Sequence, residues 1–362
     1  MCQFPSLDLW QTLRRETRPI LLYGMGDGAD KLIERLDSLG IPYADVFASD
    51  GFVRGQHFHG RPVLTLSQAE EKYGEFVILL AFATKLPQVI DTVLALAERH
   101  PLYIPDMPIL QDAFFDLEYV RAHREELASA YALFADRQSR DLFASSVAGK
   151  LYGLPHDLLA HTSTLREVME TLPLSTFRTA VDLGAYTGDT ARTLIEMAPS
   201  VTRIVAVEPD RRSYAKLKAF GESLTEVELL PIHAAIGAES GEVSLFAKGS
   251  RSSTVGEGHT GARTVSVPAV TVDQLCEQMP VSYLKYDVEG AEMEALRGSF
   301  ETVRRDRPAI LLSLYHRPSD LFALPLYLAE LCPRYHFYLR RVRCLPVWEL
   351  DLLAVPQERD VL

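Results

Sequence analysis

The segment AVDLGAYTGD, residues 180–189, constrains the fold of this chain more than any other stretch. It begins as an apolar run that ends in Asp182, and a glycine-containing turn follows directly. A second apolar run, residues 204–207, ends in Glu208. Apolar strands that are buried on both faces are typical of parallel sheets, which hold ligands beyond the carboxyl ends of their strands. The pattern therefore predicts a doubly wound α/β sheet with carboxylates at one edge.

The spacing of the glycines indicates which ligand this edge holds. The pattern DxGxxxG places Gly184 and Gly188 further apart than the GxGxxG turn that cradles a pyrophosphate. S-adenosylmethionine (SAM) has no phosphate, and the wider spacing leaves room for its sulfonium and amino-acid tail. Glu208 offers two acceptor oxygens that suit a ribose diol. The motif predicts a SAM site, and the alternative is an ordinary glycine turn of an α/β protein.

Length and composition set the broad class of the protein. The 362 residues exceed one average domain, and 47% hydrophobic and 24% charged residues are ordinary globular values. The net charge of −12 argues against a binder of nucleic-acid backbones. The four cysteines lack CxxC spacing, and no stretch reads as a signal peptide or a membrane span. We expect a cytoplasmic protein with reduced thiols that does not bind nucleic acid and has no membrane span.

The apolar patterns divide the chain into three segments. Residues 1–108 predict a small Rossmann-like α/β domain, and residues 161–362 predict a larger Rossmann-like domain that ends in two neighbouring strands. Residues 109–160 have helical spacing and no strand signal. This helical linker either connects the two sheets or pairs two chains in a homo-oligomer. Residues 249–261 are rich in Ser, Thr and Gly and predict a mobile surface loop.

Several motifs carry a resemblance to a known family. They are VDLGAYTGDT (181–190), VAVEPD (205–210), HAAIG (233–237), VTVDQL (270–275) and DVEGAE (287–292). With them the C-terminal half resembles the FkbM family of SAM-dependent methyltransferases. The resemblance implies a seven-stranded methyltransferase sheet and methylation of a hydroxyl on a sugar, polysaccharide or natural product. By position it implies that SAM is bound by Asp182, Gly184, Tyr186, Thr187, Gly188, Glu208 and Asp287, with His233 and Ala234 near the adenine.

Methylation of a hydroxyl needs a group that takes up its proton, because an alcohol is a poor nucleophile. Asp287 follows an apolar strand and should share the edge with Asp182 and Glu208. It either contacts the methionine tail or the acceptor, or it caps the next helix. His316 follows the strand AILLSLY, and we predict that it is the general base, oriented by Asp320. The alternative for His316 is a surface histidine in a loop.

A metal ion offers a second route to an activated hydroxyl. Asp287, Glu289, His316 and Asp320 provide the oxygen and imidazole ligands that suit Mg²⁺ or Mn²⁺. No compact ligand motif supports such a site, so we predict metal-free catalysis and keep the divalent ion as the alternative. Glu292 is expected to be a solvated helix residue.

Three arginines near the C-terminus, Arg340, Arg341 and Arg343, follow a strand pattern. Side chains alternate between the faces of a strand, so at most two can point the same way. We interpret them as solvated charges on an edge strand. The alternative is that one of them holds an anionic acceptor.

Two other functions stay open. Gly24, Gly26 and Ala29 form a GxGxxA turn, with Asp50 further along, and this pattern is typical of dinucleotide sites. The protein could then bind a nucleotide or act as an NAD-dependent oxidoreductase through its N-terminal domain. A non-catalytic protein that keeps the SAM-binding fold is the third option, and the intact DxGxxxG motif argues against it.

Overall fold

The computed structural model describes residues 7–110, 112–247, 253–255 and 264–360. Most of the predicted loop at 249–261 lies outside these residues. The chain forms two compact units whose sequences interleave. The first unit comprises Met1–Arg124, Arg140–Thr162 and Arg341–Glu349, and the second comprises Glu125–Ser139, Ser163–Arg340 and Leu350–Leu362.

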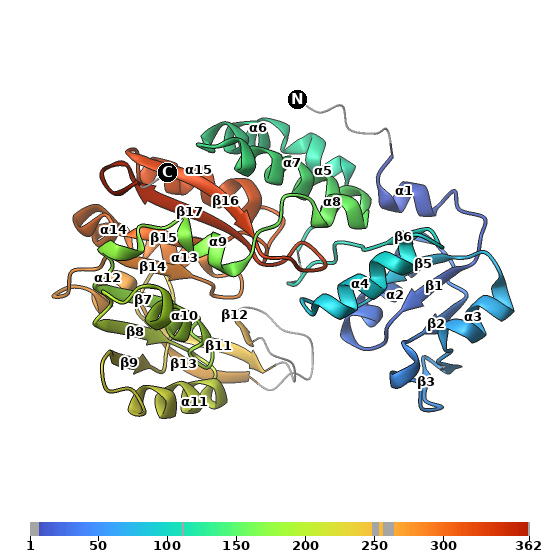
Figure 1. The fold of residues 1–362 in the computed structure, drawn as a ribbon, viewed down its shortest axis with the longest axis horizontal. Coiled ribbons are helices and arrows are strands. Elements are labelled where there is room, and N and C mark those ends of the chain that lie inside the picture. The colour runs from blue at the N-terminus through green and yellow to red at the C-terminus, as the bar shows by residue number, and fades with distance from the viewer. Residues whose placement is uncertain (1–6, 111, 248–252, 256–263, 361–362) are drawn as a thin grey trace. The chain divides into compact units, whose positions relative to one another are not determined.

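The first unit is built around a small parallel sheet with the strand order β2-β1-β5-β6 (Figure 1). Helix α2 follows β1 and ends at Gly40, whose φ of +65° is the left-handed conformation that favours glycine. Asp50, predicted beyond the second strand, begins a short 3₁₀ turn, Asp50–Phe52. The elements are α1 (Leu9–Leu13), β1 (Ile20–Tyr23), α2 (Asp27–Leu39), β2 (Asp45–Phe47), β3 (His57–Phe58), β4 (Arg61–Pro62), α3 (Leu66–Tyr73), β5 (Val77–Leu80), α4 (Pro87–Ala97) and β6 (Leu102–Tyr103).

Four helices are described in the segment with helical spacing in the middle of the chain. They are α5 (Leu117–Ala122), α6 (Arg124–Leu133), α7 (Arg137–Tyr152) and α8 (Pro155–Leu159). Asp116 begins α5 by accepting the main-chain N–H of Tyr119 at 2.9 Å, which is an ordinary N-cap. None of the helices in the described part of the chain is both long and apolar enough to cross a membrane.

The second unit contains the predicted seven-stranded sheet, with the order β16-β17-β15-β14-β7-β8-β9. Five neighbouring strands, from β15 to β9, run parallel, and β17 runs antiparallel to β15. The order places the ends of β14, β7 and β8 next to one another. The strands are β7 (Thr179–Leu183), β8 (Arg203–Val207), β9 (Glu228–Ile232), β14 (Tyr283–Tyr286), β15 (Ala309–Ser313), β16 (Tyr335–Arg341) and β17 (Leu350–Pro356).

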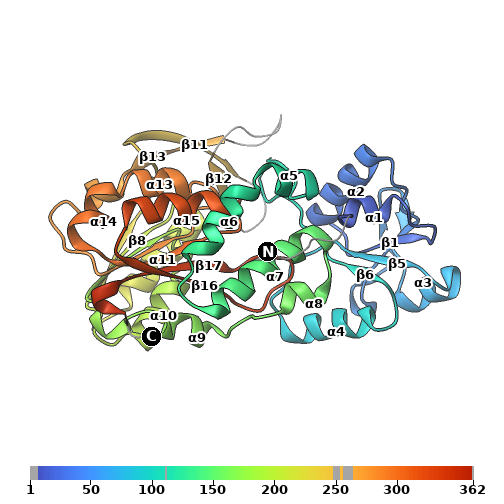
Figure 2. The same cartoon turned by 90° about the horizontal axis from the view of Figure 1, so that it is seen from above.

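Helices cover both faces of this sheet, which explains why its central strands are apolar throughout. Figure 2 shows α13, α14 and α15 over one face and α10 on the other. Every residue of β7 and β15 is buried. The helices are α9 (Leu165–Glu170), α10 (Asp189–Met197), α11 (Arg211–Glu222), α12 (Val272–Leu275), α13 (Glu292–Arg297), α14 (Phe300–Asp306) and α15 (Asp320–Leu331).

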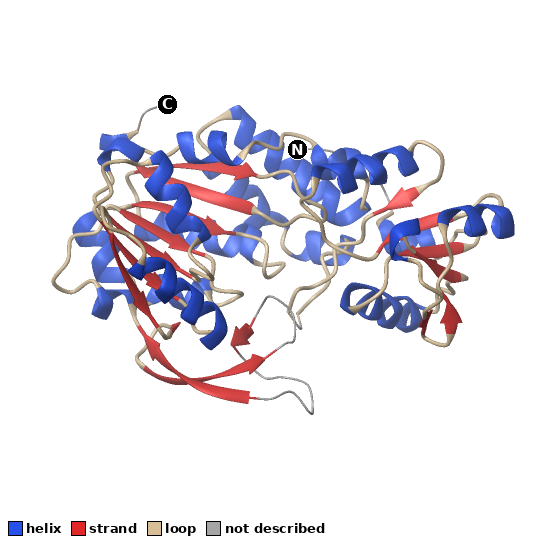
Figure 3. Ribbon diagram, turned by 60° about the horizontal axis from the view of Figure 1, so that its bottom comes forward, coloured by secondary structure: helices blue, strands red, loops and turns tan. Residues whose placement is uncertain are grey.

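A smaller sheet in the same unit has the order β10-β13-β11-β12. Its longest strands, β11 and β13, pair antiparallel from Gly241 opposite Ala269 to Phe246 opposite Thr264. The red strands of both sheets and the blue helices around the larger one can be followed in Figure 3. The small sheet consists of β10 (Ala235–Ile236), β11 (Gly241–Ala247), β12 (Ser253–Val255) and β13 (Thr264–Val270).

The interpretation of the late arginines as solvated charges is wrong for two of the three. Arg340 is buried and its Nη2 donates to Asp136 at 2.7 Å, whereas Arg343 is partly exposed and pairs with Asp91. Arg341 is fully buried, and burial lowers its pKa to about 10. Because four main-chain oxygens accept from this fully buried guanidinium, it is not free to hold an anionic acceptor. The oxygens belong to Leu158, Cys344, Pro346 and Trp348.

Candidate functional site

Three neighbouring strands bring carboxylates to one edge of the seven-stranded sheet. Asp182 is the penultimate residue of β7, Glu208 directly follows β8, and Asp287 directly follows β14. These strands are parallel neighbours in the sheet, so their carboxyl ends meet at the same edge. The structure therefore brings together the three carboxylates that the sequence predicts at one edge.

The turn after β7 has a shape that only glycine adopts readily. Gly184 has a φ of +85°, and an added Cβ would lie 1.9 Å from the main-chain oxygen of Asp287. Gly188 begins α10 with a φ of +87°, and a Cβ there would lie 2.6 Å from the ring of Phe220. At both positions the backbone is left-handed and a neighbouring atom occupies the space of a Cβ. Each of these two properties by itself disfavours any residue larger than glycine.

Glu208 is held in place by the turn that it faces. Its Oε2 accepts the main-chain N–H of Tyr186 at 2.8 Å, and its Oε1 accepts that of Asp210 at 2.7 Å. Burial raises the pKa of Glu208 to about 7, although both main-chain donors favour the ionised form. A carboxylate oxygen has two lone pairs, so each oxygen can accept one further donor from a ligand.

Asp182 is a buried carboxylate with unsatisfied oxygens. Its side chain is 0% exposed, and neither oxygen has a hydrogen-bond partner among the described residues. Burial raises its pKa to about 6. The nearest cation is the Lys285 ammonium, 3.6 Å from Oδ1, which is an ion pair but too long for a hydrogen bond. Buried polar atoms are nearly always satisfied, so Asp182 is ready to accept a donor.

Lys285 is a site residue that the sequence analysis missed. Its Nζ donates to Oδ2 of Asp287 at 3.1 Å and also pairs with Asp182. Burial alone would lower the pKa of Lys285, but the two carboxylates raise it well above its ordinary value. Lys285 stands two residues before Asp287, and such residues share a face where the strand continues. That spacing could have identified the pair.

Asp287 does not cap the helix that follows it. Helix α13 begins after Ala291, which makes no side-chain cap, and the Asp287 carboxylate accepts from Ser313 Oγ at 3.1 Å and from Tyr315 OH at 3.2 Å. Burial opposes ionisation, but Lys285 outweighs it, and the pKa of Asp287 falls to about 2. The residue is therefore ionised at any working pH.

His316 is buried among carboxylates and is not a surface histidine, because its exposed fraction is 2%. Its Nδ1 lies 2.9 Å from Glu292 Oε1, and its Nε2 lies 3.7 Å from Asp287 Oδ1 and 3.6 Å from Glu289 Oε2. Burial lowers its pKa, but the surrounding carboxylates raise it to about 10. A protonated imidazole has no free lone pair, so His316 can act as a base only after it loses that proton.

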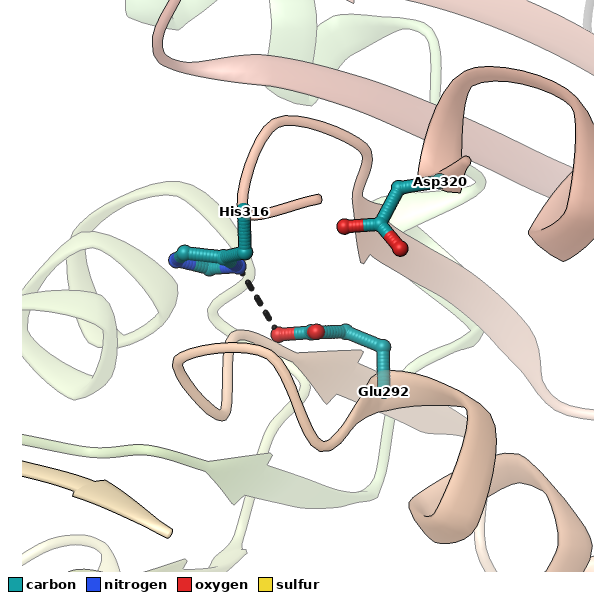
Figure 4. A group of neighbouring side chains, drawn as sticks. All are labelled: Glu292, His316 and Asp320. Carbon is teal, nitrogen blue, oxygen red and sulfur yellow. Dashed lines mark ion pairs between the residues drawn. The ribbon is translucent and has the colours of Figure 1, made fainter. Parts of the chain in front are cut away.

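Glu292 lies in this cluster, and the expectation that it is solvated is wrong. It is 1% exposed, and its Oε1 accepts the main-chain N–H groups of Val288 at 2.9 Å and Gly290 at 3.3 Å. Glu289 is 38% exposed and has a φ of +55°, and burial of its carboxyl raises its pKa to about 7. Asp320 is buried, which raises its pKa to about 7. Figure 4 shows Glu292, His316 and Asp320 facing one another.

The residues predicted near the adenine follow β9. His233 Nε2 lies 3.1 Å from the main-chain oxygen of Pro209, and its ring lies 4.9 Å from that of Tyr214. Ala234 is buried. Thr187 lies in the glycine turn, where its main-chain oxygen accepts from Arg192 at 3.0 Å. The contacts of His233 with Pro209 and Tyr214 were not predicted, because the local sequence does not show which residues lie beside the end of β9.

One family model matches part of this chain. Residues 182–339 match the model of the methyltransferase FkbM domain. The crystal structure of methyltransferase FkbM from Methylobacillus flagellatus KT superposes with a TM-score of 0.67 at 17% identity, and the match covers 94% of this chain and 91% of that chain. At this identity the likeness shows a common fold, and it extends over nearly the whole chain. No curated protein matches this sequence.

Two further solved structures resemble parts of the chain more weakly. Aeropyrum pernix fibrillarin in complex with SAM gives a TM-score of 0.33 at 16% identity, over 51% of this chain and 69% of that chain. A SAM-dependent methyltransferase from Aquifex aeolicus gives a TM-score of 0.29 at 10% identity, over 63% of this chain and 97% of that chain.

Proposed function

Because residues 182–339 match the model of the methyltransferase FkbM domain, we propose that this protein transfers the methyl group of SAM to a hydroxyl oxygen of a sugar, polysaccharide or natural product. The observation that carries the proposal is the meeting of Asp182, Glu208 and Asp287 around a turn that requires glycine. SAM supplies a methyl group that is already activated on a sulfonium. The protein must bind this donor and prepare the acceptor.

In this proposal each carboxylate contacts a different part of the methyl donor, SAM. Glu208 accepts from the ribose hydroxyls, because its oxygens are fixed by main-chain donors and keep free lone pairs. The unsatisfied oxygens of Asp182 accept from the amino-acid end, next to Gly184. Asp287 adds negative charge close to the positive sulfonium. The remaining residues that contact SAM are Tyr186, Thr187 and Gly188, with His233 and Ala234 at the adenine.

We assign the proton acceptor to Glu289 in preference to His316. Glu289 is the most exposed carboxylate of the cluster, and its left-handed backbone holds it at the edge of the sheet. His316 lies beneath it, 3.6 Å away, and is positioned to orient the carboxylate. As the acceptor oxygen bonds to the methyl carbon, the carbon–sulfur bond breaks and Glu289 takes the hydroxyl proton. Asp287, ionised and anchored by Lys285, orients the acceptor.

The first test is isothermal titration of the purified full-length protein with S-adenosylhomocysteine (SAH), the product formed from SAM. We expect one-to-one binding in the micromolar range. Glu208→Ala should weaken it by about 10- to 100-fold, because hydrogen bonds to a charged partner are lost. The matched control is Glu222→Ala, an exposed glutamate on α11. An equal loss in both variants would contradict the assignment of Glu208.

The second test separates the competing functions. Methyl transfer from labelled SAM is measured on a panel of saccharides and hydroxylated natural products. If SAH does not bind at millimolar concentration, the proposal fails, and NAD titration then tests the N-terminal glycine turn. If SAH binds but amine acceptors alone are methylated, the donor assignment stands and the hydroxyl acceptor is wrong.

A further inference from the structure

Three buried side chains converge near the carboxyl edge, and the proposed methyl transfer uses only one of them, His316. Glu292 begins α13, His316 follows β15, and Asp320 begins α15. Each offers one ligand atom, and these atoms all lie within 4.8 Å of one another (Figure 4). Their exposed fractions are 1%, 2% and 4%, respectively. Three separate elements therefore bring buried ligand atoms to one place.

We propose that Glu292, His316 and Asp320 form a binding site for one divalent transition-metal cation, with Mn²⁺ as the ion that fits best. Two carboxylates and one imidazole are a mixed oxygen and nitrogen set. Carboxylate oxygens suit Mn²⁺. Ca²⁺ prefers sites made of oxygen ligands alone, so the imidazole ligand favours Mn²⁺ over Ca²⁺. This set differs from the one predicted from the sequence, because Glu292 replaces Asp287 and Glu289.

One buried oxygen of this cluster is free to accept a further ligand. Oε2 of Glu292 has no hydrogen-bond partner in the described part of the chain, although its side chain is almost completely buried. Lys285 is paired with Asp182 and Asp287, and Arg317 is a cation that acts on Asp320. Two buried carboxylates and one imidazole can each give a lone pair to a dication, which would take the place of the proton on His316.

The main chain already holds the carboxylates in fixed orientations. Val288 and Gly290 donate to Oε1 of Glu292, and Arg317 donates its main-chain N–H to Oδ2 of Asp320 at 2.7 Å. Groups that orient metal ligands from behind are a regular feature of metal sites. An ion on the Nδ1 side of His316 would leave the Nε2–H to donate toward Glu289, so the site would also fix the proposed positioning role of His316.

A cavity reaches one residue of this cluster, Asp320. It has a volume of about 200 Å³ and is lined by Asp320 together with Gly290, Glu294, Arg317 and Ser319, among others. Glu294 is half exposed and adds a carboxylate to the cavity wall. A cation can therefore reach Asp320 without unfolding the surrounding turns.

The test uses the full-length protein stripped of metal with EDTA and titrated with Mn²⁺, with free Mn²⁺ followed by electron paramagnetic resonance. We expect one tightly bound ion per chain. Asp320→Asn keeps the shape of the side chain and should weaken binding at least tenfold. Glu294→Gln removes a carboxylate from the same cavity and should leave the affinity within twofold. Retained SAH binding confirms that each variant is folded.

Two results would overturn this inference. One is the absence of bound Mn²⁺ in the wild-type protein at millimolar concentration, and the other is equal affinity in wild type and Asp320→Asn. The inference can fail while SAH binding and methyl transfer persist in EDTA, in which case the proposed function stands alone. Mn²⁺ binding without SAH binding would support the metal site and contradict the proposed function.

Discussion

The main-chain oxygen of Asp287 lies 1.9 Å from the point that a Cβ on Gly184 would occupy. Real Cβ atoms do not come this close to an oxygen, so β7 and β14 can approach at this edge only because residue 184 has no side chain. The glycine of one motif and the carboxylate of another are therefore a single packing unit. Each motif depends on the other for its position.

Replacement of Gly184 by alanine should damage both stability and ligand binding. The new methyl group would meet a main-chain oxygen, and the φ of +85° would be strained, so we expect a loss of roughly 2–4 kcal/mol in the free energy of unfolding. SAH binding should also be lost. Urea unfolding and calorimetry measure the two effects. Gly241→Ala is the control, because no atom lies within 4 Å of its Cβ position. Wild-type SAH affinity in Gly184→Ala would contradict the close approach.

Glu208 should make the ligand-free protein less stable as the pH rises. Burial raises its pKa from 4.5 to about 7, so between these values the folded protein keeps a proton that the unfolded chain has released. The free energy of unfolding must fall with rising pH in that window. Burial of Asp182 acts in the same direction, up to about pH 6. Asp287 opposes it, but its pKa of about 2 confines that effect to more acidic solutions.

Urea unfolding across this window, in EDTA and without SAH, measures the slope. Glu208→Gln should flatten it by as much as one proton, whereas Glu222→Gln, an exposed glutamate, should leave it unchanged. A slope that is the same in Glu208→Gln and wild type would show that Glu208 ionises normally in the folded protein.

Removal of the Lys285 charge should be costly, because it leaves two carboxylates without their cation. We expect Lys285→Met to lower the free energy of unfolding by about 3 kcal/mol, as for other broken buried ion pairs. Its SAH affinity should fall as Asp182 and Asp287 repel each other. Lys218→Met, which removes an exposed charge on α11, should cost less than about 1 kcal/mol. Equal losses from both variants in thermal unfolding would contradict the buried pairing.

Glu289 should affect turnover without affecting the binding of SAH. Glu289→Gln keeps the size of the side chain but cannot accept a proton, so kcat should fall by about 100- to 10,000-fold, the usual contribution of a general base. The Kd for SAH should change less than threefold. His316→Gln provides the comparison, because a positioning residue should lower kcat by a smaller factor. Full turnover in Glu289→Gln would contradict the assignment of Glu289 as the general base. His316 would then be the base, or the reaction would use no side-chain base.

The sequence predicts the framework of the site because that framework is local. Asp182, Glu208 and Asp287 stand at the ends of apolar runs, and parallel strands align such ends without further information. The conformation of Gly184 follows from the same pattern. Lys285 could have been found by its spacing, but its pairing with Asp182 depends on the neighbour relation of β7 and β14, which the sequence does not state.

Burial is the property that local pattern predicts worst. Glu292 and Arg341 look like solvated charges on a helix and a strand, but both are buried and bonded to main-chain atoms. Their partners come from turns whose shapes depend on distant packing. The cluster around His316 was only partly predicted for the same reason, because Glu292 reaches it from the helix after β14.

The contacts of Arg341 limit where this chain can be cut into independent fragments. Its guanidinium binds the main-chain oxygens of Leu158 and Cys344, and both belong to the first unit, whereas most of β16 belongs to the second. A gene fragment that begins after residue 162 would encode Arg341 and the segment up to Glu349 without the carbonyl of Leu158. A single break in the sequence therefore cannot separate the two units, because each is made of three segments. The late segment Arg341–Glu349 therefore packs with a unit whose other residues all lie before residue 163.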